Sequence, residues 1–296
     1  MKEQSTSGVL FALSAAALYG VSGAIAADLF SEADPARVSE ARALIASVVL
    51  VPYAWRKGLL GMGGQLKWLA TLGLILALVG LTFYWAIDRL GVGPGATLQF
   101  IGPFFVLAWM AVVQRRPIRP VTWATAVVAL VGVMLITEAW ALDELDVLGL
   151  TSGVTSAALF AAYFLIGEHL GKTLRAVTTI TWGFVFASIF WVIVLPLWTF
   201  PTDLSNTAWA EMVWIGVGGT ALPFLAQFAA LRRIASGAVG VVATAEPVVA
   251  AASAWVLLDQ SLSPLQIIGG LLVVLAVGAV HVLGVAKVDR PMDIGF

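Results

Sequence analysis

Apolar segments long enough to cross a lipid bilayer as helices recur along the whole chain, separated by short polar connections. A helix needs about 20 residues to span the hydrocarbon core of a membrane, so the pattern predicts an all-α polytopic membrane protein with ten transmembrane helices. The apolar segments are 8–29, 39–53, 68–87, 96–113, 121–137, 148–167, 177–198, 209–231, 237–258 and 265–285. Most connections hold only a few residues, usually with Pro, Gly, Asp or Arg. They leave no room for a domain outside the membrane, so we expect the function to lie within the helix bundle.

The composition supports this interpretation and excludes several classes of function. Of the 296 residues, 60% are hydrophobic and 11% are charged, whereas soluble domains have about 25% charged residues. A soluble core cannot bury this much apolar surface, but lipid accepts apolar side chains on every face of a helix. The net charge of −1 provides no basic face for nucleic acid. The chain has no Cys, which excludes disulfides, thiolate metal sites and cysteine nucleophiles.

The distribution of Lys and Arg predicts the orientation, because these residues are retained on the cytoplasmic side. With ten helices and both termini cytoplasmic, thirteen of the sixteen Lys and Arg residues lie on the cytoplasmic side. The other three are Arg37 and Arg89, on the outer side, and Arg42, just inside the second span. One missed or extra helix would place the following basic connections on the wrong side, so the charges favour ten helices.

The two halves of the chain resemble each other. At an offset of 144 residues Gly93 meets Gly237, Pro103 meets Pro247 and Pro120 meets Pro264. At an offset of 141, Ser14-Ala15-Ala16-Ala17-Leu18-Tyr19 meets Thr155-Ser156-Ala157-Ala158-Leu159-Phe160. We therefore predict a five-helix repeat at 1–143, a second at 144–286 and a short tail at 287–296. Five is an odd number, so the second repeat enters the membrane inverted, and inverted repeats around a midplane site are typical of transporters.

Several motifs resemble the EamA domain of the drug/metabolite transporter superfamily. They are Ala41-Arg42-Ala43-Leu44, Pro103-Phe104-Phe105, Arg116-Pro117-Ile118-Arg119-Pro120, Leu130-Val131-Gly132-Val133, Glu246-Pro247 and Gln260-Ser261-Leu262-Ser263-Pro264-Leu265-Gln266. Two positions depart from the family pattern, because the acid usual before Leu-Ser-Pro is Arg116 in the first half and Gln260 in the second. The resemblance implies ten helices around a central cavity, with export by alternating access.

Within the superfamily, the length and the aromatic-rich helices are most similar to bacterial exporters of aromatic and neutral amino acids. This similarity implies an inner-membrane transporter, not an enzyme, with an amino acid as its small-molecule substrate. We expect it to work as a monomer in the lipid bilayer, without cofactor or metal. A purine, an organic cation or a drug is the alternative substrate.

Glu246 is the only acidic residue placed deep within a predicted span. It lies nine residues beyond Gly237, which is roughly 14 Å along a helix. Ionisable groups at that depth are costly and usually functional. Glu246 therefore either carries a proton or, as a carboxylate, binds a substrate ammonium. The alternative is a structural role, in which its carboxyl group binds a backbone carbonyl freed by Pro247.

Matching prolines in the fourth and ninth spans predict two kinked helices around a common site. Pro103 and Pro247 occupy these positions, and Gln99 and Phe100 immediately precede the first kink. Interrupted helices expose backbone groups suited to a zwitterion. Gln227, in the eighth span, adds an amide that can both donate and accept hydrogen bonds. Close packing alone can also explain the kinks.

Aromatic side chains inside the predicted spans are candidate walls of a substrate cavity. Lipid offers no partner for a phenol or an indole, so Tyr19, Tyr84, Tyr163 and Trp182 are expected to face the interior. Near the outer ends of the first two spans, Asp28, Glu40 and Arg42 predict a structural ion pair or a gate.

The sequence also suggests two alternatives to transport, an intramembrane protease and a receptor or scaffold. Gly20-Val21-Ser22-Gly23 resembles the nucleophile motif of intramembrane proteases, with His281 as the imagined base. The helix rise separates these two side chains by about 13 Å along the membrane normal, too far for a nucleophile and its base. A receptor or scaffold would bind a solute without moving it across sealed vesicles.

Overall fold

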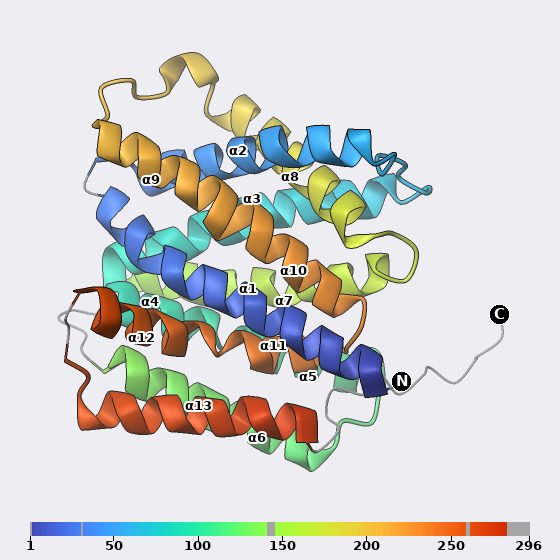
Figure 1. Ribbon diagram of the computed structural model, residues 1–296, viewed down its shortest axis with the longest axis vertical. Helices are drawn as coiled ribbons and strands as arrows, with labels where there is room; N and C mark the ends of the chain where they lie inside the picture. Colours follow the sequence, from blue (N-terminus) through green and yellow to red (C-terminus); the bar gives the residue numbers. More distant parts are fainter. Residues whose placement is uncertain (1, 31, 141–145, 259–260, 283–296) are drawn as a thin grey trace.

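A computed structural model describes residues 2–30, 32–140, 146–258 and 261–282, and every regular element among them is helical (Figure 1). The elements are α1 (Lys2–Leu29), α2 (Pro35–Arg56), α3 (Leu66–Leu90), α4 (Val92–Gln99), α5 (Gly102–Val112), α6 (Pro120–Thr137), α7 (Val147–Leu170), α8 (Ala176–Val194), η1 (Leu197–Thr199), α9 (Asn206–Gly216), η2 (Val217–Ala221), α10 (Leu222–Leu231), α11 (Ser236–Ala243), α12 (Glu246–Leu258) and α13 (Pro264–Val282).

Eight helical segments in the described part are long and apolar enough to cross a membrane. Three of them are composite: α4 continues into α5, α9 into η2 and α10, and α11 into α12. Two shorter apolar helices, Thr6–Ser22 and Pro264–Val280, correspond to the first and last predicted spans. The expected ten full-length spans are therefore represented by eight long segments and two shorter ones.

Local sequence explains where several helices begin. The Asp34 carboxylate accepts the Ala36 N–H at the start of α2, and Pro35 occupies the first helical turn. Proline suits this position because the first N–H groups of a helix have no partner within it. Asp146 and Ser205 cap α7 and α9 in the same way, by accepting the N–H groups of Gly149 and Ala208.

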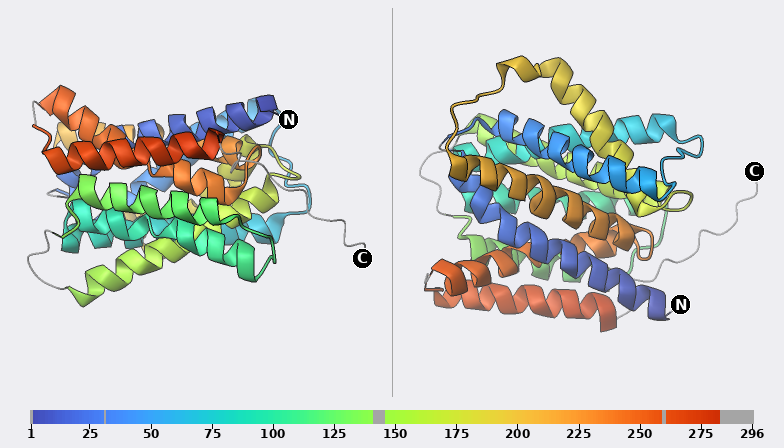
Figure 2. Two further views of the ribbon diagram at one scale, coloured as in Figure 1. Left: turned by 90° about the horizontal axis from the view of Figure 1, so that it is seen from below. Right: turned by 45° about the horizontal axis from the view of Figure 1, so that its top comes forward.

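The helices pack side by side with their axes roughly along one direction (Figures 1 and 2). Helix α3 contacts α7 and α8, α1 contacts α10 and α12, and α2 contacts α8 and α9. Helices α6 and α13 pair along one side of the bundle (Figure 2). At their crossing, a Cβ atom added to Gly132 would lie 2.7 Å from the Gly269 carbonyl oxygen, and one added to Gly269 would lie 2.6 Å from that of Gly132. The two glycines thus let these backbones meet directly.

Candidate functional site

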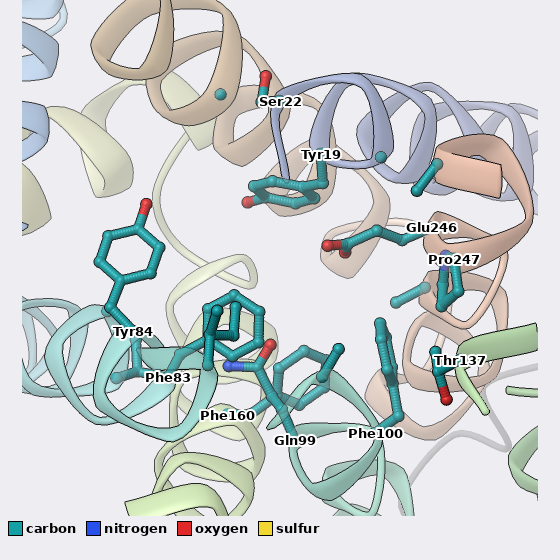
Figure 3. Close-up of a pocket in the computed structure, with 18 of the residues that line it drawn as sticks. Tyr19, Ser22, Phe83, Tyr84, Gln99, Phe100, Thr137, Phe160, Glu246 and Pro247 are labelled. Carbon is teal, nitrogen blue, oxygen red and sulfur yellow. The ribbon is translucent and has the colours of Figure 1, made fainter. Parts of the chain in front are cut away.

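A cavity of about 470 Å³ lies among the helices (Figure 3). Its lining residues come from α1, α2, α3, α4, α7, α10, α12 and neighbouring segments, so both halves of the chain contribute. A volume of this size lies in the usual range of small-molecule sites. Most of the sequence-predicted residues line it, namely Tyr19, Arg42, Tyr84, Gln99, Phe100, Tyr163, Gln227, Glu246 and Pro247.

Two interrupted helices border the cavity, and the prolines explain where each interruption falls. Helix α4 ends at Gln99, four residues before Pro103, and α11 ends at Ala243, four residues before Pro247. Proline has no N–H to give to the carbonyl four residues earlier, and its ring collides with that carbonyl. Gln99 and Ala243 both line the cavity. The chain therefore loses its regular helical hydrogen bonding next to the empty space.

The interrupted helices also pack on each other. A Cβ atom added to Gly240 in α11 would lie 3.2 Å from the Pro103 Cβ in α5. Pro103 is buried and does not line the cavity. Its place in the site is indirect, because it sets the position where α4 ends.

Gln227 connects two tyrosines on the cavity wall. The hydroxyl groups of Tyr19, in α1, and Tyr163, in α7, both donate to the Gln227 Oε1 atom at 3.2 Å. The Gln227 side chain is buried. One amide oxygen thus holds together α1, α7 and α10.

Aromatic rings form much of the apolar wall. The Tyr19 and Tyr163 rings lie 5.5 and 5.8 Å from that of Phe224. Phe160 lies 5.2 Å from the Tyr163 ring, and Phe83 and Phe100 complete the surface labelled in Figure 3. Such a wall suits an aliphatic or aromatic group.

Gln99 is held by a neighbouring helix rather than left to rotate. Its Nε2 atom donates to the Ser156 hydroxyl of α7 at 2.8 Å, and that hydroxyl lies 3.4 Å from the Val79 carbonyl of α3. This chain of contacts links the end of α4 to α7 and α3. It fixes the amide at the edge of the cavity.

Arg42 projects from α2 to the cavity and is held by neutral groups. Its Nη1 atom donates to the Tyr84 hydroxyl at 2.9 Å, and its Nε atom donates to Thr220 Oγ1 at 3.0 Å. Thr220 belongs to the π-helical turn η2, and its hydroxyl also donates to the Ile215 carbonyl at 2.8 Å. Such turns are frequent at functional sites.

The expected pair of Glu40 with Arg42 is wrong. Glu40 instead pairs with Arg37, whose Nη1 atom lies 2.7 Å from the Glu40 Oε2 atom. Residues three apart share a face of a helix and residues two apart do not, so the spacing explains the exchange. The side chain of Asp28, the third member of the expected gate, lies outside the described residues.

Trp182 also departs from expectation, because it does not line the cavity. Its indole N–H donates to the Leu60 carbonyl at 3.0 Å, in the connection between α2 and α3, and its ring lies 5.9 Å from that of Phe186. The indole N–H therefore has its hydrogen-bond acceptor in this connection rather than in the cavity.

Sequence reasoning missed several lining residues, among them Phe83, Phe160 and Phe224. It also missed Thr220, which accepts a hydrogen bond from Arg42. Phe160 had a signal, because the 141-residue offset aligns it with Tyr19. Nothing in the sequence distinguishes the others from the many other aromatic and hydroxyl side chains. Their position at the site depends on the packing of helices that are distant in sequence.

A second buried polar cluster lies away from the cavity, at the end of the bundle where α7 ends and α11 begins. Arg116 Nη1 lies 2.8 Å from Glu168 Oε1, and Glu168 Oε2 accepts the Ser236 N–H at 2.8 Å. Arg116 belongs to the connection between α5 and α6. This Arg116 cluster therefore joins three segments that are far apart in sequence.

Acidic residues tie the connections at the opposite end of the bundle. The backbone N–H of Ser205 and its hydroxyl bind the Glu32 carboxylate and hold its pKa below the ordinary value. The Gly149 N–H and the Arg89 guanidinium likewise lower the pKa of Asp146. These contacts fasten the connections before α2 and α7.

The structure gives no support for a catalytic pair of Ser22 and His281, the residues of the protease alternative. Ser22 is buried, and its hydroxyl has no hydrogen-bond partner among the described residues. The side chain of His281 lies outside them. In the described part of the chain, no group of three His, Asp or Glu side chains could hold a metal ion.

Comparison with known proteins gives consistent matches. The model of the "EamA-like transporter family" matches residues 6–138 and again residues 147–281. The chain is 24% identical over 227 residues to the threonine/homoserine exporter RhtA of Escherichia coli K12, covering 75% of this chain and 74% of RhtA. It is 26% identical over 280 residues to the uncharacterized transporter YwfM of Bacillus subtilis, covering 90% and 93% of the two chains.

A protein of known crystal structure shares the fold. It aligns with a TM-score of 0.79 at 17% identity, over 95% of this chain and 98% of the other. Together with the long apolar helices, these matches identify a multi-pass protein of the bacterial inner membrane.

Proposed function

The chain belongs to the EamA-like transporter family, and on that premise we propose that it exports small neutral amino acids, aromatic ones among them. The observation that carries the proposal is the cavity of about 470 Å³ between two interrupted helices, with polar groups set in an aromatic wall. Family relatives named as threonine/homoserine exporters support the amino acid class. The aromatic wall supports the inclusion of large side chains.

The proposed architecture is ten transmembrane helices in two inverted halves, 1–143 and 144–286, with both termini cytoplasmic. The double match of the family model, at 6–138 and 147–281, supports this division. The packing supports it too. In the proposed repeat α10 is the counterpart of α3, and α1 is the counterpart of α7. Helix α3 contacts α7, and α10 likewise contacts α1. Ser47 of α2 and Ser188 of α8 occupy equivalent positions at the 141-residue offset, and their hydroxyls are 2.9 Å apart.

Export then follows by alternating access. The two halves rock about the cavity, so that it opens first to the cytoplasm and then to the outside. The interrupted helices supply backbone groups to the substrate without a permanent opening through the bundle.

Transport by the purified chain in proteoliposomes tests the function. Vesicles that contain the protein are assayed for transport of a panel of aromatic, aliphatic and hydroxylated amino acids. Purines, sugars and organic cations are assayed as alternative substrates. We expect flux of several neutral amino acids above that of empty liposomes. Arg89→Gln is a matched control, because Arg89 pairs with Asp146 in a solvent-exposed position away from the cavity. Flux of purines or cations without flux of any amino acid contradicts the proposal.

Glu246 has two candidate roles in this cycle, proton carrier or ligand of the substrate ammonium. A proton carrier makes export faster when the compartment representing the cytoplasm is acidic. Under that role, Glu246→Gln removes the response to the gradient while exchange at equal pH continues. Gradient-dependent flux that survives in Glu246→Gln contradicts the proton role.

A further inference from the structure

Arg42 carries a guanidinium that its neighbours satisfy only in part. Its Nε and Nη1 atoms each donate one hydrogen bond, to Thr220 and Tyr84. Its Nη2 atom donates to none of the described residues. A guanidinium has five N–H groups in a planar fork, so the described residues leave one edge of the fork unbound on a residue that lines the cavity.

Arg42 also has no acidic partner among the described side chains. Other arginines do have one: Arg37 pairs with Glu40, Arg89 with Asp146 and Arg116 with Glu168. An arginine within a membrane bundle is costly and normally pairs with an acid or lines a functional cavity. The Tyr84 ring, 5.4 Å from the guanidinium carbon, and the two hydroxyls orient the charge without neutralising it.

Glu246 places an acidic group in the same cavity. It makes no hydrogen bond or ion pair with the described residues, and its carboxylate points into the cavity near Tyr19 (Figure 3). Tyr84, which holds Arg42, lies on the other side of the cavity in this view. Arg42 and Glu246 both line this cavity, so one chamber contains both groups.

A cavity with one positive and one negative group suits a solute that carries both charges. An isolated cation leaves the guanidinium without a partner, and an isolated anion leaves the carboxylate without one. Leaving a buried charge unpaired is strongly unfavourable. The free edge of a guanidinium matches the two oxygens of a carboxylate.

We propose that Arg42 binds the carboxylate and Glu246 the ammonium of a zwitterionic α-amino acid, whose side chain lies against Phe83, Phe100 and Phe160. This inference rests on the proposed function and makes it specific. Arg42 becomes a substrate-binding residue rather than part of a gate, and discrimination depends on both ends of the α-amino acid backbone.

Binding of three related compounds to the purified protein tests the proposal. The probes are L-phenylalanine, phenethylamine, which lacks the carboxylate, and 3-phenylpropionate, which lacks the ammonium. If another amino acid of the transport panel binds more tightly, that amino acid and its two corresponding analogues replace this set. We expect the wild type to prefer the amino acid over either analogue by about ten-fold or more.

The variants separate the two charges. Arg42→Gln is expected to weaken amino acid binding by about 10- to 100-fold and to change amine binding less than about three-fold. Glu246→Gln is expected to weaken amino acid binding while sparing the deaminated acid. Arg42→Lys keeps the charge but not the fork, so its preference should be intermediate. Arg89→Gln is the control and should match the wild type.

Each preference is a ratio measured on one protein sample, so partial loss of folded protein does not change it. If Arg42→Gln does not fold, the wild-type preference and that of Arg42→Lys still decide the matter. A wild type that binds the amine as tightly as the amino acid overturns the inference and leaves amino acid export standing. If Arg42→Gln prefers the amino acid over the amine as strongly as the wild type does, the inference is likewise overturned and amino acid export still stands. A wild type that binds and transports no amino acid overturns the proposed function itself.

Discussion

Arg42 and Arg116 are two partly buried arginines in opposite situations. Arg116 has a carboxylate partner, Glu168, which also binds the Ser236 N–H. Among the described residues, Arg42 is bound only by the hydroxyls of Tyr84 and Thr220, and it lines the cavity. A paired arginine joins segments of the protein, whereas an oriented arginine without an acid keeps binding capacity for a solute. Under the proposed function, the partners of each arginine therefore separate a structural role for Arg116 from a binding role for Arg42.

The largest effect is expected from Glu168→Ala in the Arg116 cluster. It leaves the Arg116 guanidinium and the Ser236 N–H without their acceptor, which should cost about 2–4 kcal/mol of unfolding free energy. Thermal unfolding in detergent measures the loss as a lower melting temperature. Asp203→Ala is the control, because Asp203 is an exposed acid with no hydrogen bond or ion pair to the described residues, and its loss should change stability little. A melting temperature of Glu168→Ala equal to that of the control contradicts a structural role for the cluster.

Arg42→Gln should show the opposite profile. Transport of neutral amino acids should fall by about 10- to 100-fold, the loss expected for charged hydrogen bonds to the substrate. The melting temperature should stay close to the wild-type value, because removing an unpaired charge also removes its desolvation cost. Flux in proteoliposomes and thermal unfolding of the same preparation provide the two measurements. Strong destabilisation with intact flux per folded molecule would place Arg42 in the same class as Arg116.

A smaller effect is expected when the groups that orient Arg42 are removed one at a time. Tyr84→Phe deletes one hydrogen bond to the guanidinium and keeps the ring, so amino acid affinity should fall by about three- to ten-fold. Thr220→Val should act similarly. Affinity for phenethylamine, which has no carboxylate for Arg42 to bind, should hardly change. Equal losses for both ligands would indicate a general disturbance of the cavity rather than a misplaced guanidinium.

The smallest effect is expected at Gln227, where two donors share one acceptor. Tyr19→Phe or Tyr163→Phe alone should cost about 0.5–1.5 kcal/mol, because the other hydroxyl still satisfies the amide oxygen. The double variant leaves that oxygen without either donor and should cost more than the sum. Melting temperatures of the four proteins in the double-mutant cycle measure the coupling. Additive costs would show that the two hydroxyls act independently.

Much of the fold could be predicted because a membrane constrains the sequence strongly. Apolar length alone identified the helical segments, and the covalent geometry of Pro103 and Pro247 explains interruptions four residues before each. The cavity was predictable in part, since a polar or hydroxyl-bearing aromatic side chain in the middle of an apolar span is more stable facing the bundle interior than facing lipid.

The partners of those residues could not be predicted in the same way. Arg42 binds Tyr84 and Thr220, which are 42 and 178 residues away in sequence. Trp182 finds its acceptor in a connection 122 residues away. Such pairs depend on how whole helices pack. Only the pairing of Glu40 with Arg37, in place of Arg42, could have been predicted locally, because residues three apart lie on the same face of a helix.

The contact between Ser47 and Ser188 bears on how such a chain could have arisen. Under the proposed inverted-repeat architecture the two serines occupy equivalent positions, and their hydroxyls are 2.9 Å apart. In an ancestor made of two separate copies inserted in opposite directions, this contact would join a residue to its own twin. Any mutation there would alter both sides at once. Gene fusion removes that constraint, so each serine can afterwards evolve alone and the assembly can become asymmetric around an asymmetric solute.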